Sequence, residues 1–147
     1  MSHSNIVSEF IRNNIRGKPD PDAIPRMSRM LLIDKTITDI NIKDSTWGDE
    51  TALHYQSMHG TTGSVAWLLR QDPPPDINAL DCNQWTSLME AAISNIDSEG
   101  KVRLLLDHGA DRDIEKRKGR TALDIARSEN KPAVIDMLEN HRPDVSR

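Results

Sequence analysis

Aromatic residues and cysteines are scarce in this chain of 147 residues, and it has no long apolar run. Only 3% of the residues are aromatic and 36% are hydrophobic, whereas 29% are charged. Few apolar residues and many charges are typical of an elongated protein with a thin core, and also of a partly disordered one. Composition alone therefore leaves both alternatives open.

The single cysteine, Cys82, cannot form a disulfide within the chain. The N-terminal stretch "MSHSNIVSEFIRNNIRGK" has no apolar run as long as that of a signal peptide. No stretch approaches the ~20 apolar residues that cross a bilayer. We therefore expect a protein of the cytoplasm or nucleus, where thiols stay reduced, without a membrane anchor.

Motifs for catalysis and for metal binding are also missing. The chain has five histidines but no His-Glu-x-x-His, no glycine loop that would cradle a phosphate and no Cys-x-x-Cys pair. We therefore expect no enzyme, no cofactor and no metal. The net charge of −4 disfavours a general nucleic-acid binder, which would usually be basic.

A repeat with a period of 35 residues dominates the chain. Thr-x-Leu triplets begin at Thr51, Thr86 and Thr121. Each triplet opens a short segment with helical spacing, which a polar break separates from a second apolar segment. Regular spacing of this size indicates stacked units, each of which buries its apolar face only against its neighbours.

Local signals predict two helices in each unit. A threonine or serine can cap the first helix, and Ser87 with Glu90 predicts a capping box in the middle unit. Polar breaks are expected at 60–63, 95–100 and 130–131, followed by second helices over 65–69, 102–106 and 134–138. Pro132 suits the start of the last helix, and Gly109 suits a left-handed helix end.

The repeated residues resemble the ankyrin repeat family, whose pattern is Gly-x-Thr-Pro-Leu-His-x-Ala-Ala, a glycine break, and Val-x-x-Leu-Leu-x-x-Gly-Ala-Asp. The matching positions are Thr51, Leu53, His54, Gly60, Leu68 and Leu69 in the first clear unit, Ala91, Ala92, Val102, Leu105, Leu106, Gly109, Ala110 and Asp111 in the middle unit, and Gly119, Thr121, Leu123 and Ala126 in the last. The resemblance covers residues 39–141. It implies an all-α solenoid of helix–turn–helix repeats with finger-like turns, and inter-unit hydrogen bonds from His54.

The chain departs from the family pattern at several positions. Ala52, Ser87 and Ala122 stand where the family has proline, and the period exceeds the family's ~33 residues. The extra residues fall at 71–78 and 94–101, where they are either tolerated surface connections or a recognition feature. We expect one domain over 1–147, with an N-terminal capping repeat (4–43), two repeats (44–80 and 81–115), a C-terminal capping repeat (116–142) and a tail (143–147).

The resemblance implies that partners bind a concave face made by the fingers and the first helices. The residues predicted to contact a partner protein are Trp47, Glu50, Tyr55, Met58, Trp85, Glu90, Arg117, Lys118 and Arg120. Trp47 and Trp85 stand at finger positions, where each either anchors a partner or lies flat on the neighbouring finger. Trp67 is expected in the core, and Cys82 as an exposed thiol or a redox-sensitive contact.

Four cations crowd the last finger, in residues 116–120. This cluster is a solvated loop, a grip for an acidic partner segment, or a nuclear import or nucleic-acid contact. We expect a monomeric, non-catalytic protein-binding module that acts as a regulator, inhibitor or assembly adaptor. The alternative function is binding of nucleic acid or another acidic ligand through the basic finger.

Overall fold

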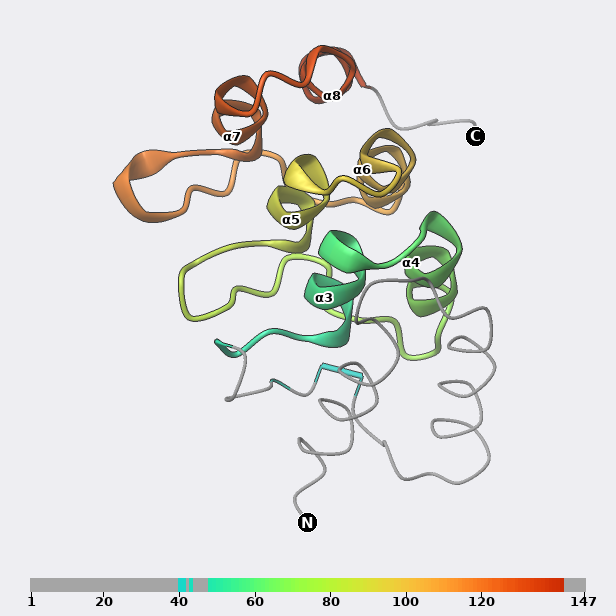
Figure 1. Cartoon of the computed structure of the whole chain (residues 1–147). Coiled ribbons are helices and arrows are strands. Elements are labelled where there is room, and N and C mark those ends of the chain that lie inside the picture. Colours follow the sequence, from blue (N-terminus) through green and yellow to red (C-terminus); the bar gives the residue numbers. More distant parts are fainter. Residues whose placement is uncertain (1–39, 42, 44–47, 142–147) are drawn as a thin grey trace.

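The computed structural model describes residues 40–41, 43 and 48–141 (Figure 1). Its α-helices and one short 3-10 helix are α3 (Ala52–His59), α4 (Thr62–Leu69), α5 (Ser87–Ile93), α6 (Ser98–Asp107), η2 (Arg117–Gly119), α7 (Ala122–Ser128) and α8 (Pro132–Asn140). Most of the expected N-terminal cap (4–43), Trp47 and the tail (143–147) lie outside the described residues. None of the described helices has the length and apolar character needed to cross a membrane.

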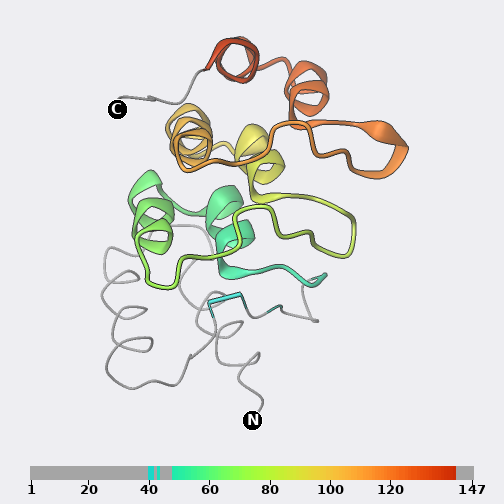
Figure 2. The same ribbon diagram turned by 180° about the vertical axis from the view of Figure 1, so that it is seen from behind.

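The six α-helices within the described residues form two parallel columns. The first helices α3, α5 and α7 contact one another in sequence, and the second helices α4, α6 and α8 form the other column (Figure 1). Figure 2 shows the same stack from behind, with the loops before α5 and α7 projecting beyond the column of first helices. This arrangement confirms the predicted all-α solenoid of stacked helix pairs.

Threonine caps start all three first helices. The backbone N–H groups of His54, Met89 and Asp124 donate to the hydroxyls of Thr51, Thr86 and Thr121, at 3.3, 3.2 and 3.4 Å. The expected capping box of Ser87 and Glu90 is wrong, because α5 begins one residue earlier than that box requires. The boxes form instead in the outer units, where His54 and Asp124 can accept a hydrogen bond from the cap and Met89 cannot.

The second helices start earlier than expected in two units. Thr61 caps α4 and Asp97 caps α6, so both helices begin inside segments predicted as polar breaks. The helix boundaries predicted at Gly109 and Pro132 are confirmed. Gly109 has φ +88° just after α6, a conformation that suits glycine, and Pro132 is the first residue of α8.

Apolar residues of both helix columns form one continuous core. The alanines Ala91, Ala92 and Ala126 are fully buried, so neighbouring helices approach closely at these positions. Trp67 is half-buried and packs against this core, as predicted. Because every unit shares its core with the next, the units depend on one another for stability.

His54 joins the first unit to the middle one. Its Nδ1 accepts from the backbone N–H of Thr51 at 3.2 Å, so its Nε2 carries the proton and donates to the carbonyl of Trp85 at 2.8 Å. The ring is fully buried, and burial lowers the pKa of this histidine. The inter-unit hydrogen bond implied by the family resemblance is thus present.

Replacing His54 by alanine is expected to lower the free energy of unfolding by about 2–3 kcal/mol, because the buried N–H of Thr51 loses its partner and the inter-unit hydrogen bond to the carbonyl of Trp85 is lost, which leaves that carbonyl only the N–H of Asp81. Urea denaturation measures the loss. His59→Ala, at an exposed position of the same helix, is the control and should change the free energy by less than ~0.5 kcal/mol. Equal losses in the two variants would contradict the inter-unit role of His54.

Candidate functional site

Two fingers project on the side of the first helices (Figures 1 and 2). The middle finger is closed by the carboxylate of Asp81, which accepts from the backbone N–H groups of Asn83 and Trp85 at 2.8 and 2.9 Å. The last finger is closed by the N–H of Lys116, which donates to the carbonyl of Arg120 at 2.8 Å. Local hydrogen bonds therefore hold both fingers in defined shapes. We call the surface formed by residues 48–50, 81–85 and 116–120 and the accessible sides of α3, α5 and α7 the finger face.

Trp85 lies half-buried between two fingers. Its ring packs against the core, and the ammonium of Lys116 lies 4.7 Å from the ring centroid. This geometry corresponds to the alternative in which the ring lies on the neighbouring finger. Part of the ring is still accessible, so a contact between Trp85 and a partner stays a prediction. Cys82, at the tip of the same finger, is exposed as expected.

Of the four cations in the basic finger (residues 116–120), two contact other side chains and two are exposed. Lys116 covers Trp85, and the guanidinium of Arg120 donates to the hydroxyl of Ser128 at 2.6 Å. Arg117 and Lys118 are exposed at the turn. Only the latter two therefore present their whole charge to solvent.

The first-helix candidates differ in exposure. Tyr55 and Met58 are half-buried on α3, and the Tyr55 ring lies 4.7 Å from the His59 ring. Glu90 occupies the position of α5 that Tyr55 occupies on α3, one period earlier. Glu90 is only 6% exposed, so most of its side chain is hidden from a partner in this structure.

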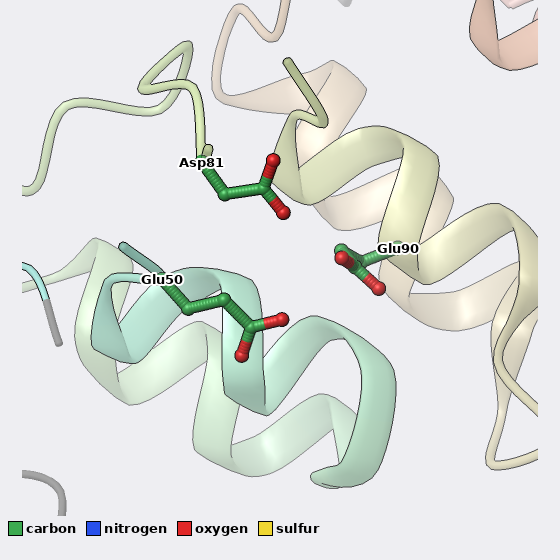
Figure 3. Close-up of side chains that lie close together, drawn as sticks. All are labelled: Glu50, Asp81 and Glu90. Atoms are coloured by element: carbon green, nitrogen blue, oxygen red, sulfur yellow. The ribbon is translucent and has the colours of Figure 1, made fainter. Parts of the chain in front are cut away.

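Three carboxylates converge between the first and middle fingers. Glu50, Asp81 and Glu90 each bring one carboxylate oxygen to within 4.8 Å of the other two (Figure 3). They come from the start of α3, the middle finger and α5 (Figure 3). Burial, together with the nearby negative charges of Glu50 and Asp81, raises the pKa of Glu90 to about 8. We call these three residues the acidic cluster.

The sequence pattern names Glu50 and Glu90 for the binding face but does not single out Asp81. The period of 35 places Glu50 in the same column as Trp85, and Tyr55 in the same column as Glu90. This register could have indicated that the first finger approaches α5. It does not show how far each carboxylate reaches, which depends on how closely the units stack.

The segment 94–101 consists of the connection after α5 and the first turn of α6, and it packs inside the molecule as well as lining its surface. Lys101 is fully buried, and its ammonium donates to the carbonyl of Gly60 at 2.9 Å and to the hydroxyl of Ser94 at 2.8 Å. Burial lowers the pKa of Lys101 to about 8. A groove of about 540 Å³ lies between this loop and the start of α8. The contacts of Lys101 give the segment 94–101 a structural role, and its recognition role remains a prediction.

The chain is similar to a known repeat family and to several known proteins. The family model for ankyrin repeats (3 copies) matches residues 2–111 and 73–147. CAP-Gly domain-containing linker protein 3 from Mus musculus is 31% identical over 111 residues, and the proteins of that name from Xenopus laevis and Homo sapiens are 32% identical over 111 residues. The aligned part is 74% of this chain but only 19–20% of each relative, so the chain spans about a fifth of their length. The fold and the family match together show that the chain belongs to the ankyrin repeat family.

Proposed function

We propose that the chain is a non-catalytic module that binds a partner protein on its finger face. Ankyrin repeats are generally protein–protein interaction modules. The observation that carries the proposal is the column of equivalent finger positions Glu50, Trp85 and Arg120, where side chains of different chemistry stand in register on rigid fingers. The hydrogen bonds that close the middle and last fingers use the carboxylate of Asp81 and backbone groups, so the side chains of Trp85 and Arg120 are not needed to close them.

Charge along the finger face favours one orientation of the partner. The acidic cluster stands at the end near α3, and the exposed Arg117 and Lys118 stand at the end near α7. A partner whose surface is basic opposite α3 and acidic opposite α7 would be oriented by these charges as it approaches. This orientation speeds association more than it tightens binding. Because the fingers are already ordered, little conformational entropy is lost when the partner docks. The module would act as a regulator, inhibitor or adaptor by what it covers or brings together.

Affinity capture tests the proposal. We would compare the wild type with Arg117→Glu, Lys118→Glu on the finger face and with Arg70→Glu, Arg103→Glu, an equal charge change at exposed positions at the end of α4 and on α6. The partner should be retained by the wild type and the control, and should bind the finger variant roughly tenfold more weakly. Equal binding by both variants would contradict the finger face as the site.

Nucleic-acid binding is the second candidate, and the exposed pair Arg117 and Lys118 is the observation that favours it. The contacts of Lys116 and Arg120 leave few cations for phosphates, so protein binding is the better-supported function. Affinity for a DNA or RNA duplex that falls steeply with salt and is lost in the finger variant would support the second candidate instead.

A further inference from the structure

The tip of the last finger presents two exposed cations on a tight turn. The N–H of Lys116 donates to the carbonyl of Arg120 at 2.8 Å, and the N–H of Gly119 donates to the carbonyl of Lys116 at 3.0 Å. Arg117 and Lys118 occupy the turn between these bonds and are exposed. Among the described residues, neither of the two cations forms an ion pair or a side-chain hydrogen bond. Their charges are therefore available to a partner.

Nearby acidic residues offset only part of this charge. Residues 113–120 contain four cations and two carboxylates, Asp113 and Glu115. Both carboxylates precede the turn and are exposed. The segment therefore keeps an excess of positive charge, although the whole chain has a net charge of −4. A local positive excess on an acidic protein favours a negatively charged partner at this position.

Trp85 provides a fixed aromatic surface next to this finger. Its N–H donates to the carboxylate of Asp81 at 2.9 Å, and its carbonyl accepts from the N–H of Asp81 at 3.1 Å and from Nε2 of His54 at 2.8 Å. The ring is half-buried, and the ammonium of Lys116 lies 4.7 Å from its centroid. Lys116 therefore joins the ring of the middle finger to the base of the finger that carries the exposed cations.

An aromatic ring beside cations suits a partner segment that combines carboxylates with an apolar side chain. Tryptophan and arginine are among the residue types most enriched in the strong contacts of protein interfaces. Carboxylates can pair with Arg117 through charge-assisted hydrogen bonds, and an apolar side chain can cover the accessible part of Trp85. Because hydrogen bonds hold both fingers, the two contacts are presented in a fixed arrangement, and little entropy is lost on binding.

A nucleic acid fits this surface less well. Its phosphates follow one another along the whole strand, whereas the exposed cations occupy only the tip of one finger. The carboxylate of Asp81 closes the finger that carries Trp85, and the carboxylate of Glu50 lies near it. A phosphate backbone that ran from the tip toward the first finger would meet these negative charges. A protein segment can place its carboxylates at the tip alone.

We infer that Trp85 and the tip of the last finger bind an acidic segment of the partner protein, in which carboxylates flank an apolar side chain. The carboxylates pair with Arg117 and Lys118, and the apolar side chain contacts Trp85. This inference rests on the proposed function, because it requires a protein on the finger face. It adds the chemistry of the segment that the partner presents.

The probe is the peptide acetyl-Glu-Glu-Leu-Glu-Glu-amide, titrated at low salt and followed by amide and indole N–H shifts in two-dimensional NMR. We expect saturable shifts at the indole of Trp85 and over residues 116–120, with a dissociation constant of about 0.1–1 mM. The analogue with glutamine in place of every glutamate should bind roughly tenfold more weakly or worse, because the charge attraction is lost. The analogue with serine in place of leucine should bind roughly threefold more weakly or worse, because the apolar contact is lost.

Substitutions in the protein locate the binding. The pair Arg117→Gln, Lys118→Gln should weaken binding of the probe roughly tenfold or more. The pair Arg70→Gln, Arg103→Gln makes the same charge change at exposed positions of the second-helix column and should leave binding unchanged. Circular dichroism checks that both variants are folded.

The inference is overturned if the probe gives no saturable shifts, if either analogue binds as well as the probe, or if both pairs of substitutions weaken binding equally. A DNA duplex is titrated in parallel, and binding of the duplex over residues 116–120 without binding of the probe also overturns the inference. If a captured partner binds Arg117→Glu, Lys118→Glu more weakly but the probe does not bind the wild type, the inference fails while the proposed function stands.

Discussion

Leu105→Ala is expected to lower the free energy of unfolding by about 2–5 kcal/mol, because a fully buried side chain is removed and a cavity is left. Leu105 is 0% exposed, and its helix α6 contacts α4, α5 and α8. The cavity therefore weakens the middle unit and both of its interfaces. Since whole domains are stable by only about 5–15 kcal/mol, this loss is a large fraction of the total.

Urea denaturation followed by circular dichroism measures the effect. Leu104→Ala is the matched control, because Leu104 is the adjacent leucine of α6 and is only half-buried. Trp85→Ala is the second comparison and should also cost less than Leu105→Ala. If Trp85→Ala costs as much as Leu105→Ala, the Trp85 ring is a core residue and is not available to anchor a partner.

Features that depend on neighbours in the sequence could be predicted. The starts of the first helices are predicted by threonines, because a hydroxyl before a helix satisfies an otherwise unpaired N–H. These threonines are Thr51, Thr86 and Thr121. Gly109 and Pro132 mark helix boundaries through the backbone conformations that they allow. The period of 35 then gives the solenoid, since units that cannot bury their apolar faces alone must stack.

Features that depend on distances between units could not be predicted from the sequence. One local prediction was also wrong: the capping box of Ser87 and Glu90 fits the sequence pattern, but the hydroxyl of Thr86 stands one residue earlier and caps the helix instead. Glu90 is then left to turn toward the first finger. Its approach to Glu50 depends on how closely two units stack, which no local pattern encodes. The contact of Lys116 with Trp85 is unpredictable for the same reason.

The second large effect concerns the pH dependence of stability in Glu90→Gln. The pKa of Glu90 is about 8 in the folded protein, against 4.5 for an ordinary glutamate. Between these pH values the folded state holds a proton that the unfolded state has lost. Stability of the wild type therefore falls as the pH rises through this interval, and the full loss is reached above about pH 8.

Glutamine cannot ionise, so Glu90→Gln should escape this loss. We expect the stability of the variant relative to the wild type to rise by about 2–4 kcal/mol between pH 4.5 and about pH 8. The rise is smaller than the full pKa shift implies, because the half-exposed Glu50 and Asp81 are partly screened by water. Any constant cost of burying the glutamine amide cancels when the two pH values are compared.

Urea denaturation of both proteins across this pH interval provides the measurement, and Glu99→Gln is the control whose difference from the wild type should stay flat. Among the described residues, the charged groups that act on Glu90 are Glu50 and Asp81, and both are present in the two proteins. Their contributions therefore largely cancel in the difference. Parallel pH curves for Glu90→Gln and the wild type would contradict the raised pKa of Glu90, and would mean that this carboxyl group ionises in the folded protein as readily as in the unfolded chain.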